Sequence, residues 1–537
     1  MIAKPQVSRS EWCWAIIWSI VVLILSCLPY LIAVQLAPAG WQFAGFLVNP
    51  LDGHSYLAKM RQGFDGSWLF HLTYTPEPHP GVFIFIFYLA LGHLAALTRL
   101  PLIWTFHLAR LLAGLLLLLA AFRFIGLVTP QLKERRLAFI FVLTASGFGW
   151  LGLIFGAFPI DMWVPEAFVP YSLYTNPHFP LGQALMLIIF QLVIWPESAK
   201  STYELTNQQP RWLATILAGL SALTLALILP FALLTVWAVL FVFLGWLYLR
   251  QHRLPWLQIW PTLGVVLGGA PVLFYDFWIS VTQPIIAGWS AQNITPAPSG
   301  LNLILGYGLI GILAVLGGWL VIRDDQLKNE QGVWLVVWWA FTTLVLVYLP
   351  LALQRRLING LHLPLCLLAA LGLRRWLDSS SLKAGYRRLI TNAVVTAGAL
   401  GTILVWTFPL LGFLSPPTES ATTALFFWRG EEIAALNWLG QHTTADEVIL
   451  ASPRIGLFVP GQTGARAFYG HPFETIEADQ KKAMVEAFYR GDIERVTPPA
   501  DYIIYGPAEQ ALGQPAALPD FEEVYSVDHI SIYRVPK

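Results

Sequence analysis

The sequence predicts a mainly α-helical, polytopic membrane bundle of about eleven transmembrane helices, followed by a small soluble α/β domain. Of its 537 residues, 56% are hydrophobic and 12% are charged, which is about half the charged share of a typical soluble domain. With 24 Trp and 33 Phe, the chain carries more apolar surface than one soluble core can bury. The formal net charge of +1 provides no basic patch, so we expect no nucleic-acid partner.

Apolar runs that are long enough, or nearly long enough, to cross a bilayer recur throughout the first 414 residues. They lie at about 12–34, 104–128, 137–157, 183–196, 212–229, 231–249, 257–280, 301–322, 333–350, 362–374 and 389–412. A further apolar segment, 82–98, contains Gly92 and His93 and follows Pro80-Gly81. This composition suits a helix that lies in the headgroup layer, and a true span is the alternative.

The loop charges favour the interfacial placement of segment 82–98. With that placement, sixteen basic residues fall in the inner segments and five in the outer loops, as the positive-inside rule expects. The five outer residues are Lys59, Arg61, Arg99, Arg355 and Arg356. We therefore expect a multi-pass protein of the cytoplasmic (inner) membrane with its N-terminus in the cytoplasm and outer loops at 35–103 and 158–182.

The composition changes abruptly at Ser415-Pro416-Pro417-Thr418, where apolar runs give way to an ordinary soluble mixture. We interpret this change as a domain boundary between a transmembrane catalytic module, 1–414, and an extracytoplasmic α/β domain, 415–537. Within the second domain, residue patterning predicts helices at 431–441 and 478–490 and strands at 447–451, 502–505 and 524–535.

Asp52 is the first candidate functional residue, in the loop that follows the first span. It can cap a short helix that ends near Gly63, which would be a purely structural role. The functional alternative is that a carboxylate beside the partly free amides of a helix start holds a metal ion or accepts a proton from a hydroxyl.

The second outer loop carries Asp161, Glu166 and His178 among prolines and aromatic residues, and it has no basic residue. Carboxylates from the two outer loops, Asp52 with Asp161 or Glu166, would share a divalent ion or divide base and orienting roles. We expect no certain cofactor beyond such a metal, with Asp52 and Asp161 as its ligands. For each second-loop acid alone, a solvated loop charge is the alternative. His178 is either a substrate contact or a structural loop residue.

Arg355 and Arg356 lie between two apolar spans, on the outer side of the expected topology. Two guanidiniums kept there against the positive-inside tendency need anionic partners, and Arg grips phosphate oxygens bidentately. A lipid phosphate is therefore the predicted ligand, and ordinary headgroup anchoring is the alternative.

Several familiar motifs are absent or misplaced. Residues 306–311 match G-x-G-x-x-G, but they lie in an apolar run without a preceding soluble strand, so we interpret them as a helix-packing pattern. The sequence has no Walker A, H-E-x-x-H or G-x-S-x-G motif. These absences argue against an ATP-driven transporter, a zincin and an α/β-hydrolase.

The first outer loop, from Asp52-Gly53-His54-Ser55 through Gly66-Ser67-Trp68, resembles the opening loop of the GT-C membrane glycosyltransferases. These include the protein O-mannosyltransferases and the bacterial lipid A aminoarabinose transferases. The likeness continues through 82–98, Ala109-Arg110-Leu111-Leu112, the basic inner loop 133–136 and the acidic second outer loop. The 355–364 stretch and a soluble C-terminal domain also look like bacterial members of the group.

The resemblance implies a GT-C-like fold and transfer of a sugar from a polyprenyl-phosphate donor, with inversion at the anomeric carbon. The acceptor would be a glycan, lipid or protein at the outer membrane face. In that family the first-loop acid is essential, and it maps onto Asp52. The family often has an acidic pair there, whereas Gly53 and His54 follow Asp52 here, so the metal and base roles both stay open.

By the same likeness, the second-loop acid is Asp161 or Glu166. We assign His54, His178, Arg355 and Arg356 to substrate binding, with Arg355 or Arg356 holding the departing phosphate. A transporter or flippase of lipid-linked glycans and a noncatalytic membrane scaffold are the rival functions. The near absence of charged residues inside the apolar runs disfavours a transport path.

Overall fold

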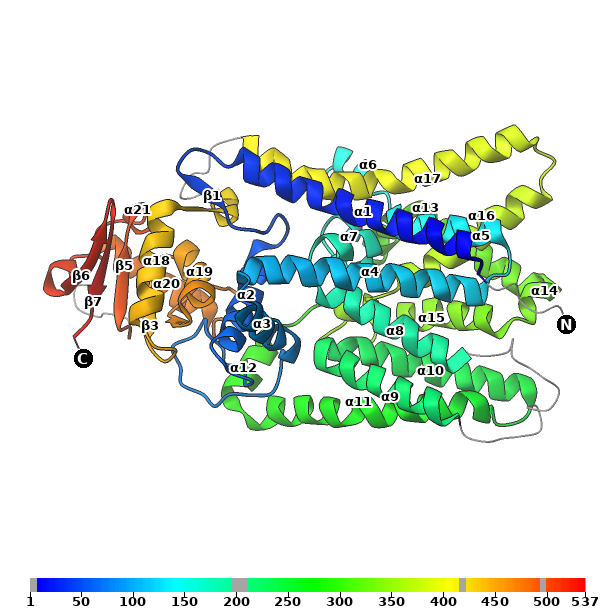
Figure 1. Cartoon of the computed structure of the whole chain (residues 1–537), viewed down its shortest axis with the longest axis horizontal. Coiled ribbons are helices and arrows are strands. Elements are labelled where there is room, and N and C mark those ends of the chain that lie inside the picture. The colour runs from blue at the N-terminus through cyan, green and yellow to red at the C-terminus, as the bar shows by residue number, and fades with distance from the viewer. Residues whose placement is uncertain (1–6, 195–210, 415–421, 493–498, 537) are drawn as a thin grey trace. The chain divides into compact units, whose positions relative to one another are not determined.

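The computed structural model describes residues 7–194, 211–414, 422–492 and 499–536 (Figure 1). This described part divides into two compact units. The first unit comprises Met1–Cys27, Arg110–Tyr275 and Thr295–Thr407, and the second comprises Leu28–Ala109, Asp276–Ile294 and Phe408–Lys537. The chain passes between the units inside α1 (Arg9–Leu36), α4 (Leu102–Val128) and α11 (Trp256–Thr282).

Within the described residues, seven helical segments are long and apolar enough to cross a membrane. They are Arg9–Leu36, Leu102–Val128, Leu132–Ile154, Pro230–Gln251, Trp256–Thr282, Gly300–Arg323 and Ala384–Phe413. Shorter apolar helices in the same described part are α3 (Ile86–Thr98), α8 (His178–Ile194), α9 (Trp212–Ile228) and α15 (Gln331–Val347). Together with α16 (His362–Ser379), these helices coincide with the predicted apolar runs. The predicted polytopic helical bundle is confirmed.

The first unit is helical, and its helices approach closely at glycines. A Cβ added at Gly317 of α13 (Gly300–Arg323) would lie 2.0 Å from the carbonyl oxygen of Leu368 in α16. The carbonyl oxygen of Gly306 would lie 1.8 Å from a Cβ added at Gly147. Residues 306–311 therefore serve close packing, as predicted. The other elements are α5 (Leu132–Thr144), α6 (Gly149–Ile154), η1 (Ile160–Met162), η2 (Pro165–Ala167), α7 (Val169–Tyr174), α10 (Pro230–Gln251), α14 (Asp325–Lys328), η4 (Arg355–Ile358) and α17 (Ala384–Thr407).

In the second unit, the loop after the first span forms two packed helices, α2 (Pro50–Phe64) and α3. They lie so close that a Cβ added at Gly92 would be 1.9 Å from the carbonyl oxygen of Met60. The 13 residues of α3 extend about 20 Å, less than the hydrocarbon thickness of about 30 Å. This length favours the predicted interfacial placement over a span.

The C-terminal part of the second unit is built on a mixed sheet. Its strand order is β4 (Arg466–Ala467), β3 (Val448–Leu450), β5 (Tyr502–Tyr505), β7 (Ile530–Arg534) and β6 (Glu522–Val527). β3 pairs in parallel with β4 and β5, and β7 pairs antiparallel with β5 and β6. The predicted α/β character is confirmed.

Alternating side chains of this sheet enter two cores. Ile449, Ile504 and Ile532 pack with α18 (Gly430–His442) and α19 (Pro453–Thr463). On the other face, Leu450 and Ile503 pack with α20 (Ala478–Arg490). Figure 1 shows these helices beside the strands. The remaining elements of the unit are α12 (Pro284–Gln292), α21 (Pro507–Gln510), η5 (Phe408–Leu414), η6 (Thr422–Phe426) and η7 (Leu518–Asp520).

Two local predictions for this part need correction. The predicted strand at 524–535 is a hairpin of β6 and β7, because the chain reverses at Asp528, whose φ is 46°. Helix α19 was not predicted at all. The predicted helices at 431–441 and 478–490 and the strands at 447–451 and 502–505 are present as α18, α20, β3 and β5.

The compact units divide the chain differently from the predicted domains 1–414 and 415–537, and residues 415–421 lie outside the described residues. The segment predicted as the first outer loop folds together with the C-terminal part. Strand β1 (Trp41–Phe43) pairs antiparallel with β2 (Phe427–Arg429), and Ala44, Ala58 and Tyr74 of that loop belong to the core beneath the sheet. The assignment of a catalytic module and an extracytoplasmic domain stays a prediction.

Candidate active site

Asp52 lies in the first turn of α2, and the helix begins three residues earlier than a cap at Asp52 would require. Pro50 is its first residue and Asn49 is the N-cap, in the left-handed conformation. The Asn49 side-chain amide donates to Oδ2 of Asp52. The predicted capping role of Asp52 is therefore wrong in position, although its negative charge still favours the helix N-terminus. The side chain is 40% exposed, which leaves it accessible to a ligand.

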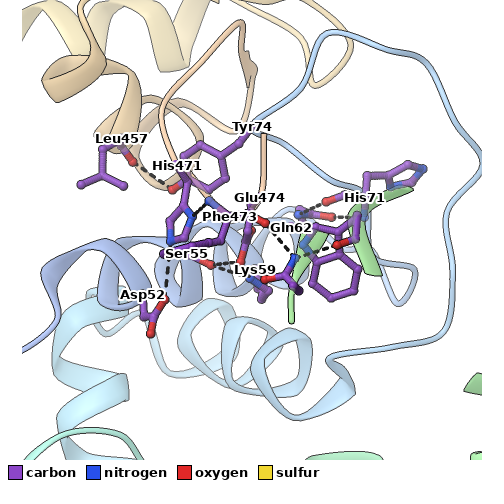
Figure 2. A network of polar contacts seen from close by, with 12 residues as sticks. Asp52, Ser55, Lys59, Gln62, His71, Tyr74, Leu457, His471, Phe473 and Glu474 are labelled. Atoms are coloured by element: carbon purple, nitrogen blue, oxygen red, sulfur yellow. Dashed lines mark hydrogen bonds and ion pairs between the residues drawn. The ribbon is translucent and has the colours of Figure 1, made fainter. Parts of the chain in front are cut away.

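One face of α2 carries Asp52, Ser55 and Lys59, which are spaced by three and four residues as neighbours on a helix are. This face is directed at the segment 471–474 of the C-terminal part, as Figure 2 shows. His471 Nε2 lies 3.5 Å from Asp52 Oδ1, and the His471 side chain is 1% exposed. The backbone N–H of Phe473 donates to His471 Nδ1 over 3.1 Å.

Lys59 and Glu474 form a buried ion pair next to this contact. Lys59 Nζ lies 2.6 Å from Glu474 Oε1 and 2.5 Å from Ser55 Oγ, and Ser55 also donates to Glu474. The Lys59 side chain is 1% exposed and lies 4.5 Å from the ring centroid of Phe85. Burial alone would raise the pKa of Glu474, but the charge of Lys59 and the hydrogen bonds from Lys59 and Ser55 outweigh it and lower this pKa.

Further contacts hold the segment that carries His471 and Glu474. The amide of Gln292, at the end of α12, donates to the carbonyl oxygens of Phe473 and Thr475 over 3.2 Å and 2.8 Å. The Asn293 amide donates to Phe473 over 2.9 Å. The segment is thus fixed at the backbone as well as through its side chains.

His54 packs in a core of aromatic rings next to this network. Its ring lies 4.6 Å from that of Phe458 and 5.1 Å from that of Phe46, both in edge-on geometry. Burial lowers its pKa to about 3, so the imidazole is neutral. The predicted substrate contact of His54 stays a prediction, and its surroundings are those of a core residue.

In the first unit, Glu166 and Arg355 contact each other. Arg355 Nε lies 3.8 Å from Glu166 Oε1, and their side chains are 29% and 6% exposed. The Arg355 guanidinium also lies 5.0 Å from the ring centroid of Trp163. The Arg356 guanidinium is 5.7 Å from the ring centroid of Phe231. The interpretation of Glu166 as a solvated loop charge is wrong, because this arginine pairs with it in a buried place.

Asp161 is also buried, at 1% exposure, so the solvated interpretation is wrong for it as well. Its Oδ2 accepts the backbone N–H groups of Gly147 and Gly149 over 3.1 Å and 2.9 Å, where α6 begins. Burial raises the pKa of Asp161 to about 7, and the two backbone hydrogen bonds act in the opposite direction. Asp161 therefore holds the turn between α5 and α6, and its catalytic and metal-binding roles stay predictions.

His178 is the first residue of α8 and is buried, with its ring 4.0 Å from that of Phe179. This placement agrees with a structural residue at the end of the second loop, and the predicted substrate contact stays a prediction.

The predicted site residues are distributed over both units. Asp52 and His54 belong to the second unit, whereas Asp161, Glu166, His178, Arg355 and Arg356 belong to the first. The structure brings Glu166 to Arg355. Among the described residues, no group of three or more His, Cys, Asp or Glu side chains converges as a metal site. The Asn49 amide and the His471 imidazole, which lie beside Asp52, are not the carboxylate oxygens that a divalent ion such as Mg²⁺ or Ca²⁺ prefers.

Four residues of the network were not predicted as site residues: Ser55, Lys59, His471 and Glu474. Lys59 was counted as a loop charge. The sequence Tyr469-Gly470-His471-Pro472-Phe473-Glu474 combines a histidine and an acid with a rigid proline. That combination could have marked the segment as part of a site, but the local sequence does not say which distant helix faces it.

Comparison with known proteins gives a likeness in structure alone. No protein-family model matches the chain, and no curated protein sequence matches it. The crystal structure of ArnT from Cupriavidus metallidurans bound to undecaprenyl phosphate aligns over 98% of this chain and 98% of that chain, with a TM-score of 0.54 and 14% identity. The chain has the fold of ArnT.

The apo crystal structure of ArnT gives the same result. It aligns over 96% of this chain and 97% of that chain, with a TM-score of 0.52 and 14% identity. The likeness to ArnT confirms the predicted membrane helical bundle with its small C-terminal α/β part.

The Asp161→Asn substitution should reduce the pH dependence of stability. A pKa raised from 3.8 to about 7 in the folded state means that ionisation of Asp161 opposes folding, so stability falls as the pH rises through this range. Asn bears no charge and keeps an oxygen for Gly147 and Gly149. We expect the variant to melt about 2 to 5 °C above the wild type at pH 8, with a smaller difference at pH 5.

Thermal melts of the purified variants at the two pH values measure this difference. Asp65→Asn is the control, since Asp65 is a 44% exposed carboxylate. Equal pH dependence of wild type and Asp161→Asn would contradict the structural role given to Asp161.

Proposed function

We propose that the chain is a glycosyltransferase that moves a sugar from a polyprenyl-phosphate donor to a hydroxyl of a glycan, lipid or protein acceptor. The observation that carries this proposal is the likeness over 98% of the chain to ArnT, whose crystal structure contains undecaprenyl phosphate. The apolar helices supply the bilayer environment that a polyprenyl chain requires. We place the reaction at the outer face of the cytoplasmic membrane, with the N-terminus in the cytoplasm and the C-terminal domain outside.

In this proposal Asp52 is the general base. The acceptor hydroxyl loses its proton to the Asp52 carboxylate while its oxygen forms a bond to the anomeric carbon. The bond from that carbon to the phosphate oxygen breaks, and its electron pair leaves with the polyprenyl phosphate. A single displacement of this kind inverts the anomeric configuration. The partial exposure of Asp52 and its hydrogen bond from Asn49 support an accessible, oriented carboxylate.

Arg355 and Arg356 bind the phosphate of the donor in this proposal. A guanidinium has five N–H donors, and Glu166 engages Arg355 through one of its nitrogens at 3.8 Å. Stacking on Trp163 further fixes the plane of the Arg355 guanidinium. We therefore propose that Glu166 positions Arg355 and that Arg355 stabilises the negative charge that develops on the leaving phosphate. The proton transfer at Asp52 requires no metal ion in this proposal, since the carboxylate itself takes the proton.

Asp52→Asn should lower the rate of sugar transfer by about 100-fold or more, since general base catalysis contributes about 10²- to 10⁴-fold. The assay incubates the purified chain with a panel of polyprenyl-phosphate sugars and acceptors and measures released polyprenyl phosphate and glycosylated product by mass spectrometry. Asp65→Asn, at the C-cap of the same helix, is the matched control and should keep full activity.

Undiminished transfer by Asp52→Asn would eliminate the base role. Movement of the lipid-linked sugar across vesicles without any new glycosidic bond would favour a flippase. If the folded wild-type chain shows neither sugar transfer nor movement of the lipid-linked sugar, the scaffold function would be favoured.

Arg355→Gln should raise the KM for the donor about tenfold, because a charged hydrogen bond to the phosphate is worth about 1.5 kcal/mol or more. The KM for the acceptor should change little. The same assay at varied donor concentration measures the donor KM. Arg253→Gln is the control, because Arg253 is an exposed arginine. An unchanged donor KM in Arg355→Gln would exclude Arg355 from phosphate binding.

A further inference from the structure

His471 has a position that the proposed chemistry does not yet use. It is buried, it belongs to the C-terminal α/β part, and its Nε2 is directed at Asp52 Oδ1 over 3.5 Å (Figure 2). Among the described residues, Nε2 has no hydrogen-bond partner within normal geometry. A buried imidazole nitrogen without such a partner is costly unless it has a use.

The hydrogen bond at the other ring nitrogen assigns the tautomer. Phe473 N–H donates to Nδ1, so Nδ1 holds a lone pair and bears no proton. The imidazole is then neutral and carries its hydrogen on Nε2. That hydrogen is the one directed at the Asp52 carboxylate. Hydrogen bonds of this type are often long before substrate binds and shorten afterwards.

The ring is held in this orientation from several sides. It lies 5.7 Å from the ring of Tyr74 and 6.1 Å from that of Phe473, measured between centroids. Tyr74 is itself fixed, because its hydroxyl donates to the carbonyl oxygen of Leu457 over 2.9 Å. Three residues on, Glu474 is anchored by Lys59. These contacts therefore fix the orientation in which His471 faces Asp52.

We propose that His471 is a positioning residue of the transfer reaction, donating its Nε2 hydrogen to Asp52 so that the carboxylate is ionised and correctly oriented when the acceptor arrives. This inference rests on the proposed base role of Asp52. During the reaction the acceptor proton passes to the Asp52 carboxylate and later to water, and the His471 proton stays on Nε2. The C-terminal part thereby contributes a residue to the active site in addition to any role in covering it.

Other ionisable groups surround this pair and must be kept constant in a test. Glu474, Lys59 and Tyr74 adjoin His471, and Tyr88 interacts with Asp52. The variants below change none of them. His471→Gln keeps a polar atom only at the Nε2 position, His471→Asn keeps one only at the Nδ1 position, and His471→Ala removes both.

Two substitutions separate positioning from a merely structural role. The side-chain amide of His471→Gln reaches the position of Nε2 and can donate to Asp52. The shorter His471→Asn can accept the Phe473 N–H at the position of Nδ1, but it places no donor near Asp52. We expect His471→Asn and His471→Ala to lower kcat about 10- to 100-fold, as loss of an orienting partner commonly does. His471→Gln should stay within about threefold of wild type.

His442→Ala is the matched control, because His442 is an exposed histidine at the end of α18 in the same domain. Its kcat should equal that of the wild type. If His471→Asn is as active as His471→Gln or more so, or if His471→Ala keeps full activity, the positioning role is overturned. Because Asn and Gln variants each retain one polar atom of the ring, the comparison holds even if His471→Ala does not fold.

A second measurement needs no sugar transfer and so separates failure of this inference from failure of the proposed function. A hydrophobic carbodiimide modifies protonated carboxyl groups, and peptide mass spectrometry quantifies the modification of Asp52. Loss of the His471 donor should make labelling of Asp52 at pH 7 about three- to tenfold faster in His471→Asn, but not in His442→Ala. Identical labelling in His471→Asn and the wild type would overturn the inference even in an active enzyme.

Discussion

The buried ion pair between Lys59 and Glu474 is the constraint on which the candidate site depends. A lysine whose side chain is 1% exposed must have a close anionic partner, because an unpaired buried charge is very costly. Glu474 supplies that partner, and it brings with it the short segment that begins at His471. Since Asp52 stands seven residues before Lys59 on the same helix face, the pair also determines what Asp52 contacts.

This constraint explains why the predicted first outer loop and the C-terminal part belong to one compact unit. A helix with a buried charge on one face cannot fold alone, and α2 obtains its counter-charge from residues more than 400 positions away. The pairing of β1 with β2 and the entry of Ala58 and Tyr74 into the core of the α/β part have the same effect. If the proposed transfer reaction takes place, this arrangement attaches the carboxylate proposed as its base to a folded domain.

Local sequence signals account for much of the fold. The apolar runs predicted the membrane helices because length and hydropathy decide whether a helix can cross a bilayer. Helix α2 was foreseen from Asp52 to Gly63, with its start misplaced by the preference of Asp for caps. Helix α19 was not predicted although Ser452-Pro453 and Gly464 are ordinary start and stop signals. It contains Pro460, a residue that usually ends or kinks a helix.

The site was harder to predict because its contacts are not local. Hydropathy does not tell whether an acid in a loop is solvated. The sequence therefore did not predict that Asp161 is buried and accepts two backbone N–H groups. It also did not predict that Glu166 pairs with Arg355. Likewise, 419 residues separate Ser55 from Glu474, and only folding brings them together. The identity of Asp52 as a candidate was available early, whereas its partner His471 was not.

The anomeric configuration of the transferred sugar tests the central chemical claim most directly. NMR coupling constants of the product made by the purified chain from a polyprenyl-phosphate sugar of known configuration decide the question. A base-assisted single displacement at Asp52 predicts complete inversion and an enzyme free of attached sugar throughout turnover. A product with retained configuration, or a sugar covalently bound to the chain, would contradict the account.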